Sequence, residues 1–439
     1  MTERDMTQAQ AYARQLLDFI DASPSPWHAV DSMALQLQQA GFKPLLESEP
    51  WQLQAGGRYY VIRDGSSLIA CVMGDKALTE TGFKMVGAHT DSPGLRVKPQ
   101  PVMTSGDLVR LGVEIYGGPI LATFSDRDLS LAGRISYKTD NNTIAVKNIC
   151  FEQPLVRLPN LAIHMNRQVN EEGLKLHKQN ELPLLIADHM TQTLSADYFV
   201  ELLADQAELT NVEIPGWELN VYDTQKGVFW GDKGQFIANS QLDNLASCHA
   251  ALTALLNDAC LHSGNTLVCA FFDHEEIGSE SHKGADSAFL ADTLKRMAWA
   301  VGIGDADFYR VLAQSFLISA DMAHAWQPNF ASAYEPEHKV LVNQGPVIKH
   351  NANQRYTTES LSSALFIEWC QQAGVSWQHY SHRCDIPCGS TIGPMLSARL
   401  GVRSIDIGNP MWAMHSIRES AGVFDHCDLI HVLRHFFTS

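Results

Sequence analysis

The sequence contains no apolar run that approaches the ~20 residues required by a membrane-spanning helix. The first ten residues are polar and carry both signs of charge, and no apolar segment typical of a secretion signal follows them. Residues 11–20 instead place Leu16, Leu17 and Ile20 on one side of an amphipathic helix. We therefore expect a cytoplasmic protein that does not bind membranes.

Positive charge is also scarce. The 439 residues include 32 Lys and Arg against 49 Asp and Glu, which gives a formal net charge of −17. Nucleic acids and anionic membranes are bound through basic patches, so this balance argues against both kinds of partner. The excess acid could serve solubility alone, or part of it could hold cations.

Paired cysteines are missing as well. The nine cysteines are an odd number, and they are scattered along the chain. This pattern indicates free thiols in a reducing cytosol rather than a disulfide framework. Cys384 and Cys388 lie closest together, but no second Cys or His pair at zinc-finger spacing accompanies them, so they give little support to a metal site.

The length exceeds what one ordinary core contains, so two domains are expected. No internal repeat or low-complexity tract interrupts the chain. Residues 95–235 show short apolar alternations separated by turns such as 116–119 (Tyr-Gly-Gly-Pro), which predicts antiparallel strands and hairpins. The later part alternates short apolar strands with helices, which is typical of a layered α/β fold.

The elements of this later part can be placed from their periodicity. We predict strands at 267–272, 316–320 and 402–407, and helices at 242–256 and 361–373. The simplest organisation is an α/β catalytic domain formed by residues 1–94 and 236–439. A mostly-β domain at 95–235 interrupts it.

One candidate site lies where a predicted strand ends at His89. Asp91 follows two residues later, and residues i and i+2 of an extended chain point the same way. His89 could therefore bind a metal through one ring nitrogen while Asp91, or its surroundings, holds the other. Alone, the pair is better explained as a strand-end histidine followed by a turn aspartate.

Asp243 and the pair Glu275 and Glu276 are further candidates. Asp243 opens a predicted helix, and by itself it would be explained well as a helix N-cap. Glu275 and Glu276 follow a buried strand, and neighbouring carboxylates in a partly dry site raise each other's pKa unless a cation is present. One Glu could then bind a metal while the other moves a proton, although a solvated acidic turn would also fit the pair.

Asp321 ends another apolar strand, and His415 follows a third. Neither position is informative alone. Together, two imidazoles and three carboxylates form a ligand set suited to zinc, manganese or cobalt. The positive charge of two divalent ions would balance the negative charge of three carboxylates and a hydroxide. The five candidate ligands are His89, Asp243, Glu276, Asp321 and His415.

Seven segments, in order along the chain, resemble the aspartyl aminopeptidase family (metallopeptidase family 18). They are residues 87–93 (Gly-Ala-His-Thr-Asp-Ser-Pro), 243–244 (Asp-Asn), 275–279 (Glu-Glu-Ile-Gly-Ser), 319–325 (Ser-Ala-Asp-Met-Ala-His-Ala), 345–351 (Gly-Pro-Val-Ile-Lys-His-Asn), 387–394 (Pro-Cys-Gly-Ser-Thr-Ile-Gly-Pro) and 414–419 (Met-His-Ser-Ile-Arg-Glu). The resemblance implies a three-layer α/β zinc-peptidase domain interrupted by a dimerisation domain, which would be residues 95–235. It also implies self-association into dimers, commonly within tetrahedral dodecamers.

The resemblance further implies a role for each candidate residue. Asp243 would bridge two Zn²⁺ ions, with Mn²⁺ or Co²⁺ as substitutes. His89 and Asp321 would complete one metal site, and Glu276 and His415 the other. Asp91 would orient His89, and Glu275 would be the general base for a metal-bridging hydroxide. His164 would reach a neighbouring subunit's site, unless it is only an interface histidine.

The implied substrates are short peptides that lose an N-terminal residue, with a preference for Asp or Glu. An acidic side chain requires a cation, for which Lys349 is the first candidate and Arg355 a weaker one. Lys349 could also be an ordinary surface lysine. His324 and Gly389, in matched segments, are further candidates for substrate contact.

The sequence departs from the family pattern at two places. His274 stands where Asn is expected, and residues 326–327 (Trp-Gln) stand where Val-His is common. Both changes could alter the substrate pocket, so side-chain preference is less secure than reaction type. The rival hypotheses are a dipeptidase or N-acyl amino acid deacylase that also uses two zinc ions, and a non-catalytic assembly protein.

Overall fold

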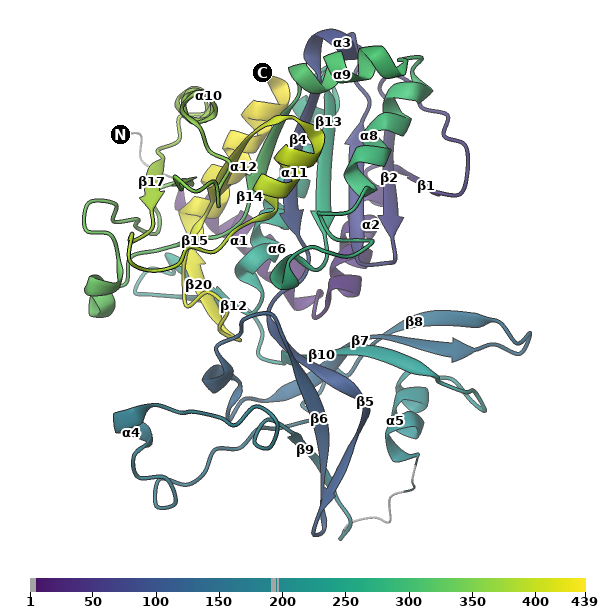
Figure 1. Cartoon of the computed structure of the whole chain (residues 1–439), viewed down its shortest axis with the longest axis vertical. Helices are drawn as coiled ribbons and strands as arrows, with labels where there is room; N and C mark the ends of the chain where they lie inside the picture. Colours follow the sequence, from purple (N-terminus) through teal and green to yellow (C-terminus); the bar gives the residue numbers. More distant parts are fainter. Residues whose placement is uncertain (1–4, 191–194, 196) are drawn as a thin grey trace.

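The computed structural model describes residues 5–190, 195 and 197–439. An α/β part forms the upper half of the molecule in Figure 1, and a mostly-β part forms the lower half. The chain enters the lower part after β4 and returns to the upper part after β10.

A nine-stranded sheet forms the centre of the upper part. Its middle strands β13, β4, β14 and β18 run parallel to one another. In spatial order, the strands are β1 (Lys43–Leu45), β2 (Arg58–Arg63), β3 (Ser67–Val72), β13 (Thr266–Phe272), β4 (Phe83–His89), β14 (Phe316–Ala320), β18 (Arg403–Gly408), β16 (Val347–His350) and β17 (Gln378–Ser381).

Helices cover both faces of this sheet, because its central strands are apolar on both sides. In β13, Leu267, Cys269 and Phe271 join one hydrophobic core, and the alternate residues join the other. The first core includes α1 (Met6–Asp21), α2 (Pro26–Gln39), α6 (Leu242–Leu255), α7 (Asp258–Leu261), α10 (Ser360–Gln372) and α12 (Val423–Thr438). The second includes α3 (Leu78–Thr81), α8 (Phe289–Ala300), α9 (Asp305–Gln314) and α11 (Ile392–Leu400).

A six-stranded antiparallel sheet forms the lower part and has its own core. The helix α5 (Tyr198–Gln206) packs into this core through Phe199 and Leu203. The strands in spatial order are β8 (Ile144–Cys150), β7 (Leu129–Lys138), β10 (Gly216–Asp223), β5 (Gly94–Ser105), β6 (Leu108–Tyr116) and β9 (Leu184–Asp188), and the short helix α4 (Val169–Glu172) lies in a long excursion between β8 and β9.

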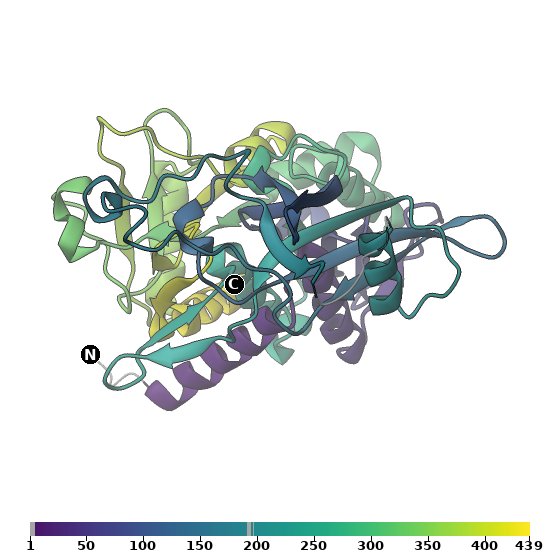
Figure 2. The ribbon, with the colours of Figure 1, turned by 90° about the horizontal axis from the view of Figure 1, so that it is seen from below.

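A smaller five-stranded sheet lies near the junction of the two parts. Figure 2 shows its β11–β12 hairpin running alongside α1. The strands are β11 (Val228–Trp230), β12 (Phe236–Asn239), β20 (Glu419–Gly422), β19 (Pro410–Trp412) and β15 (Ala323–His324).

The α/β prediction is confirmed, and the predicted strands and helices agree with β13, β14, β18, α6 and α10 to within one or two residues at each end. The division of the chain at 95 and 235, and a dimerisation role for the lower part, stay predictions. Among the described helices, none is long and apolar enough to cross a bilayer.

Candidate metal centre

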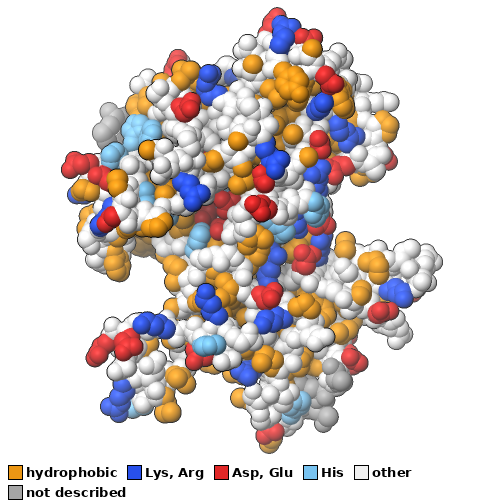
Figure 3. Space-filling view, in the orientation of Figure 1, with side chains coloured by type: hydrophobic (Ala, Val, Ile, Leu, Met, Phe, Trp, Pro, Cys, Tyr) orange, Lys and Arg blue, Asp and Glu red, His pale blue; other side chains and the backbone are white. Residues whose placement is uncertain are grey.

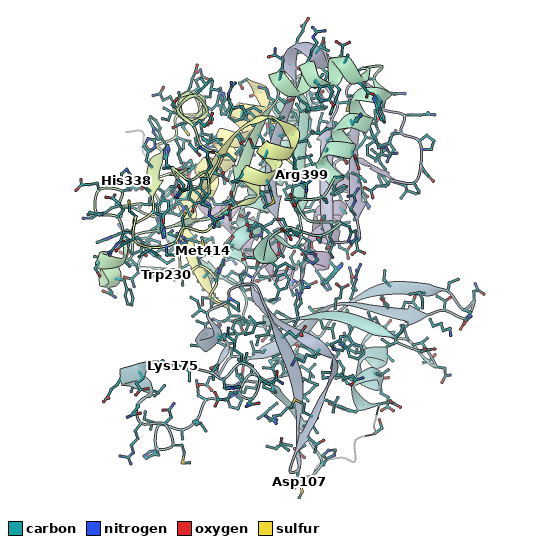
Figure 4. The ribbon with its side chains drawn as sticks, viewed as in Figure 1. Asp107, Lys175, Trp230, His338, Arg399 and Met414 are labelled. Carbon is teal, nitrogen blue, oxygen red and sulfur yellow. The ribbon has the colours of Figure 1, made fainter. Side chains whose placement is uncertain are left out.

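Strand register brings the candidate residues to one edge of the large sheet. His89 is paired with Phe272, so β4 ends level with β13 and the segment of Glu275 begins beside it. Ser319 is paired with Gly87, which places Asp321 next to His89. Figure 3 shows acidic and histidine side chains gathered between the upper and lower parts, and Figure 4 places Met414, next to His415, in the same region.

His89 is 1% exposed and faces carboxylates with one nitrogen. Its Nε2 lies 3.4 Å from Asp243 Oδ1, 3.5 Å from Asp321 Oδ1 and 4.0 Å from Glu275 Oε2. Its Nδ1 lies 3.0 Å from the backbone oxygen of Asp91 and 3.4 Å from that residue's Oδ1. The backbone carbonyl, rather than the carboxylate, therefore lies at hydrogen-bonding distance and leaves Nε2 available as a ligand.

His415 faces the other side of the same carboxylate cluster. Its Nε2 lies 3.5 Å from Asp243 Oδ2 and 3.4 Å from Glu276 Oε2. The two oxygens of Asp243 thus face two different histidines. Among the described residues, His89 forms a potential metal-binding group with Glu275 and Asp321, and a second with Asp243 and Glu276.

The chemistry of this cluster fits divalent cations. Asp243 Oδ1 and Glu276 Oε1 are buried, and neither finds a hydrogen-bond partner among the described residues. Buried carboxylate oxygens without donors are costly, and a cation between them and the imidazoles removes that cost. Nitrogen and oxygen donors suit zinc, manganese or cobalt.

The pKa values of the clustered side chains are shifted because the buried carboxylates have too little positive charge beside them. Burial, followed by neighbouring carboxylates, raises the pKa of Glu275 well above its usual range, although His89 opposes the shift. Burial raises the pKa of Glu276 to about 7. Burial alone would lower the pKa of His415, but its contacts with Asp243 and Glu276 outweigh burial and raise it to about 11. A cation would displace these protons.

Several groups that hold the ligands were not assigned from the sequence. Glu419, 2% exposed, accepts hydrogen bonds from the backbone N–H of Asp243 (3.0 Å) and of His415 (2.7 Å). Ser92 Oγ donates to the backbone oxygen of Asp243 (2.6 Å), and Asn244 Nδ2 donates to that of Ala320 (2.9 Å). Glu419, Ser92 and Asn244 all lie in the seven segments, but only folding shows what each contacts.

A cavity of about 160 Å³ adjoins the cluster. Lys349, His324 and Gly389 line it, together with Tyr356 and Tyr380. Lys349 is 3% exposed on β16, and its Nζ lies 3.5 Å from Asp321 Oδ2, so it is not a surface lysine. Burial lowers the pKa of His324 to about 4, so this imidazole is neutral near pH 7. Arg355 is exposed and absent from the lining.

The structure bears on the roles expected for Asp243, the cysteines and His164. Asp243 is not an N-cap, because its carboxylate faces the two histidines. The potential metal-binding groups found among the described residues include no cysteine, and the nine cysteines, all of them described, form no disulfide. His164 is exposed in the excursion between β8 and β9 and does not line the cavity. A role for His164 would therefore require a second chain.

Sequence comparison decides the family. Residues 19–437 match the aminopeptidase I zinc metalloprotease (M18) family. The chain belongs to the M18 family. It is therefore a peptide-hydrolysing enzyme of the zinc metalloprotease class, which confirms the resemblance found in the sequence.

Close relatives and solved structures cover nearly the whole M18 chain. It is 48% identical to a probable M18 family aminopeptidase 2 of Stutzerimonas stutzeri and 47% identical to one of Azotobacter vinelandii, with 97% of each protein covered. A solved structure of an Ape4 and Nbr1 complex superposes with a TM-score of 0.94 at 38% identity, covering 98% of this chain and 86% of that one. A solved structure of an S. cerevesiae mApe1 dodecamer superposes with a TM-score of 0.84 at 27% identity, covering 97% of this chain and 96% of that one.

Proposed function

We propose that this M18 aminopeptidase removes single residues from the N-termini of peptides, with a preference for Asp or Glu, and uses two zinc ions. Asp243 supports the two-ion centre most directly, because its two oxygens face different histidines at 3.4 and 3.5 Å. A carboxylate in this arrangement can be shared between two cations. The proposed ligands are His89, Asp243, Glu276, Asp321 and His415.

Bound divalent ions would lower the pKa of a coordinated water from 15.7 to about 7 and polarise the scissile carbonyl. The protein supplies the proton transfers. Glu275 follows a rigid buried strand, its side chain is 14% exposed, and it faces His89 at 4.0 Å. It takes a proton from the attacking water and returns that proton to the leaving amine. Asp91 orients both His89 and the backbone of Glu275.

The cavity beside the cluster supports the removal of a single residue and suggests which residue is preferred. A free α-amine can enter this cavity, whereas an internal peptide bond offers no amine. Lys349 supplies a buried ammonium group for an acidic side chain, and the neutral His324 can donate or accept a hydrogen bond. A second cavity of about 260 Å³ shares His324, Met414 and His415 with the first and gives the rest of the peptide a path outward.

Self-association and a cytoplasmic location belong to the same proposal. A relative of known structure is described as a dodecamer. The excursion that carries His164 exposes Leu161, Ile163 and Met165, by 67%, 47% and 76%. Exposed apolar side chains of this size are typical of surfaces covered by another chain. His164 would then reach the site of a neighbouring subunit.

The decisive experiment compares Glu275→Gln with Glu280→Gln, an exposed control in the same segment. Hydrolysis of Asp-, Glu-, Leu- and Ala-anilides is measured before chelation, after chelation, and after zinc is restored. Glu275→Gln should retain zinc and lose ~10²–10⁴-fold in kcat, because general acid–base catalysis contributes about that much. Glu280→Gln should resemble the wild type.

Near-normal turnover by Glu275→Gln would contradict its role as the base. Activity on N-acetylated substrates, with none on free-amine substrates, would favour a deacylase instead. Well under one metal ion per chain in the purified protein would contradict the two-zinc centre.

A further inference from the structure

One turn of the lower sheet lies next to three residues of the metal centre. Strand β6 ends at Tyr116, and the chain continues through Gly117 and Gly118. Tyr116 contacts Asp91, Gly118 contacts His415, and Gly117 between them lies close to Glu276. We call residues 116–118 the β6 turn.

Tyr116 holds Asp91 in place. Its side chain is 7% exposed, and its hydroxyl donates to Asp91 Oδ2 at 2.6 Å. The carboxylate of Asp91 also accepts the backbone N–H groups of Glu275 and Glu276, each at 3.1 Å. The guanidinium of Arg96, on the neighbouring strand β5, lies 3.8 Å from the centre of the Tyr116 ring. The phenol is therefore held by its own sheet while it orients the carboxylate that positions both glutamates.

Gly117 lies close to Glu276, and Gly118 contacts His415 through its backbone carbonyl. Gly117 has φ +67, and a Cβ atom there would lie 3.1 Å from both Cβ and the backbone oxygen of Glu276. Both the conformation and the space favour glycine. The carbonyl of Gly118 lies 3.1 Å from His415 Nδ1, on the side of the ring opposite the carboxylates. Accepting that N–H keeps Nε2 of His415 free for a metal.

We propose that the β6 turn is a positioning element of the catalytic centre, through which the lower sheet sets zinc retention and the alignment of Glu275. This inference rests on the two-zinc peptidase function proposed above. The lower part of the molecule then has a role inside each active site as well as in any assembly. Tyr116 acts through Asp91, so it is a positioning residue rather than a catalytic one.

Tyr116→Phe tests the proposal, because it removes only the hydroxyl and keeps the ring that packs against Arg96. The matched control is Tyr222→Phe, on β10 of the same sheet, whose hydroxyl donates to the backbone oxygen of Phe151 at 2.7 Å and contacts no ligand. Tyr116→Phe should lower kcat on Asp-anilide ~10–100-fold, because losing a partner that orients a ligand typically has effects of that size. KM should change less than about twofold.

Zinc retention provides a readout that does not depend on turnover. In competition with a chelator, Tyr116→Phe should lose zinc at concentrations that leave Tyr222→Phe loaded, at equal melting temperature and oligomer size. Gly117→Ala should lose zinc further, because its Cβ would push against Glu276. If Tyr116→Phe matches Tyr222→Phe in both kcat and zinc retention, the inference is wrong. If the wild type binds zinc but hydrolyses no peptide, the proposed function fails while the zinc comparison still decides the role of the turn.

Discussion

Lys349 could neutralise either Asp321 or the acidic side chain of a bound substrate. Its ammonium is buried 3.5 Å from Asp321 Oδ2, and it lines the cavity that would receive an acidic side chain. The first contact would assist the metal centre, whereas the second would select the substrate. Zinc content and substrate preference distinguish the two roles.

Lys349→Met removes the charge and keeps a side chain of similar length. If Lys349 binds the substrate carboxylate, kcat/KM for Asp-anilide should fall ~10–150-fold, which corresponds to the 1.5–3 kcal/mol of a charged hydrogen bond. The value for Leu-anilide should stay unchanged or rise. Lys339→Met, at an exposed lysine, is the control.

The same measurements reveal whether Lys349 serves the metal centre instead. An unchanged ratio of Asp-anilide to Leu-anilide hydrolysis would contradict a role for Lys349 in specificity. Lost zinc with an unchanged ratio would show that Lys349 mainly supports Asp321.

Two helices of the upper part carry a buried histidine pair, from which we predict a loss of stability at low pH. His249 of α6 lies 2.9 Å from His426 of α12, ring nitrogen to ring nitrogen, and the two are 4% and 2% exposed. Burial lowers the pKa of His249 to about 4, and it lowers the pKa of His426 well below 6.5. Both rings are therefore neutral in the folded protein at neutral pH.

The lowered pKa values make the protein less stable in acid. The histidines of the unfolded chain bind protons near pH 6.5, whereas those of the folded chain do not. Their contribution to the free energy of unfolding is therefore full above pH 6.5 and is lost as pH falls towards 4. At pH 5, His249 alone should reduce the free energy of unfolding by about 2 kcal/mol.

His249→Gln stays neutral at every pH, so its loss of stability between pH 7 and pH 5 should be smaller than that of the wild type by this amount. Denaturant unfolding with chelator present measures the difference without a contribution from bound metal. His262→Gln, at an exposed histidine, should behave like the wild type. Equal losses in His249→Gln and the wild type would contradict this explanation.

At the scale of the whole molecule, His164 of one chain could contribute to the catalytic site of a neighbouring chain. His164 is exposed and lies outside the cavity of its own chain. Figure 4 shows the same excursion, marked by Lys175, extending away from the metal centre. A catalytic contribution from His164 in an assembly would therefore be made in trans.

Mixing two inactive variants tests this directly. Glu275→Gln removes the proposed base. His164→Ala removes the histidine proposed to act on a neighbouring chain, and it should lower kcat ~10²–10³-fold if that histidine stabilises the oxyanion. Chains dissociated, mixed in equal amounts and reassembled should recover about a quarter of wild-type activity, because that share of sites in a random assembly pairs an intact Glu275 with a neighbour's intact His164.

Mixing the intact oligomers without dissociation is the control and should recover no activity. If reassembled mixtures also remain inactive, His164 does not act on a neighbouring chain.

Much of this structure could be predicted from local patterns. Strands such as Thr266–Phe272 were found because a short, fully apolar run bounded by polar residues has few other solutions. The candidate metal ligands could be predicted as a set, because polar residues at the ends of buried strands converge on one edge of a parallel sheet. Asp243 illustrates the limit, since an acidic residue that opens a helix is a cap in most proteins.

The sequence alone determined the family, the α/β fold class and which side chains could bind metal, because periodicity and ligand chemistry are local properties of the chain. Only the tertiary structure decided that Asp243 faces two histidines, that Lys349 is buried, and that Tyr116 from the lower sheet holds Asp91. These contacts join residues as far apart as Asp243 and His415, and no local pattern encodes the distance between segments that meet only when the whole chain folds.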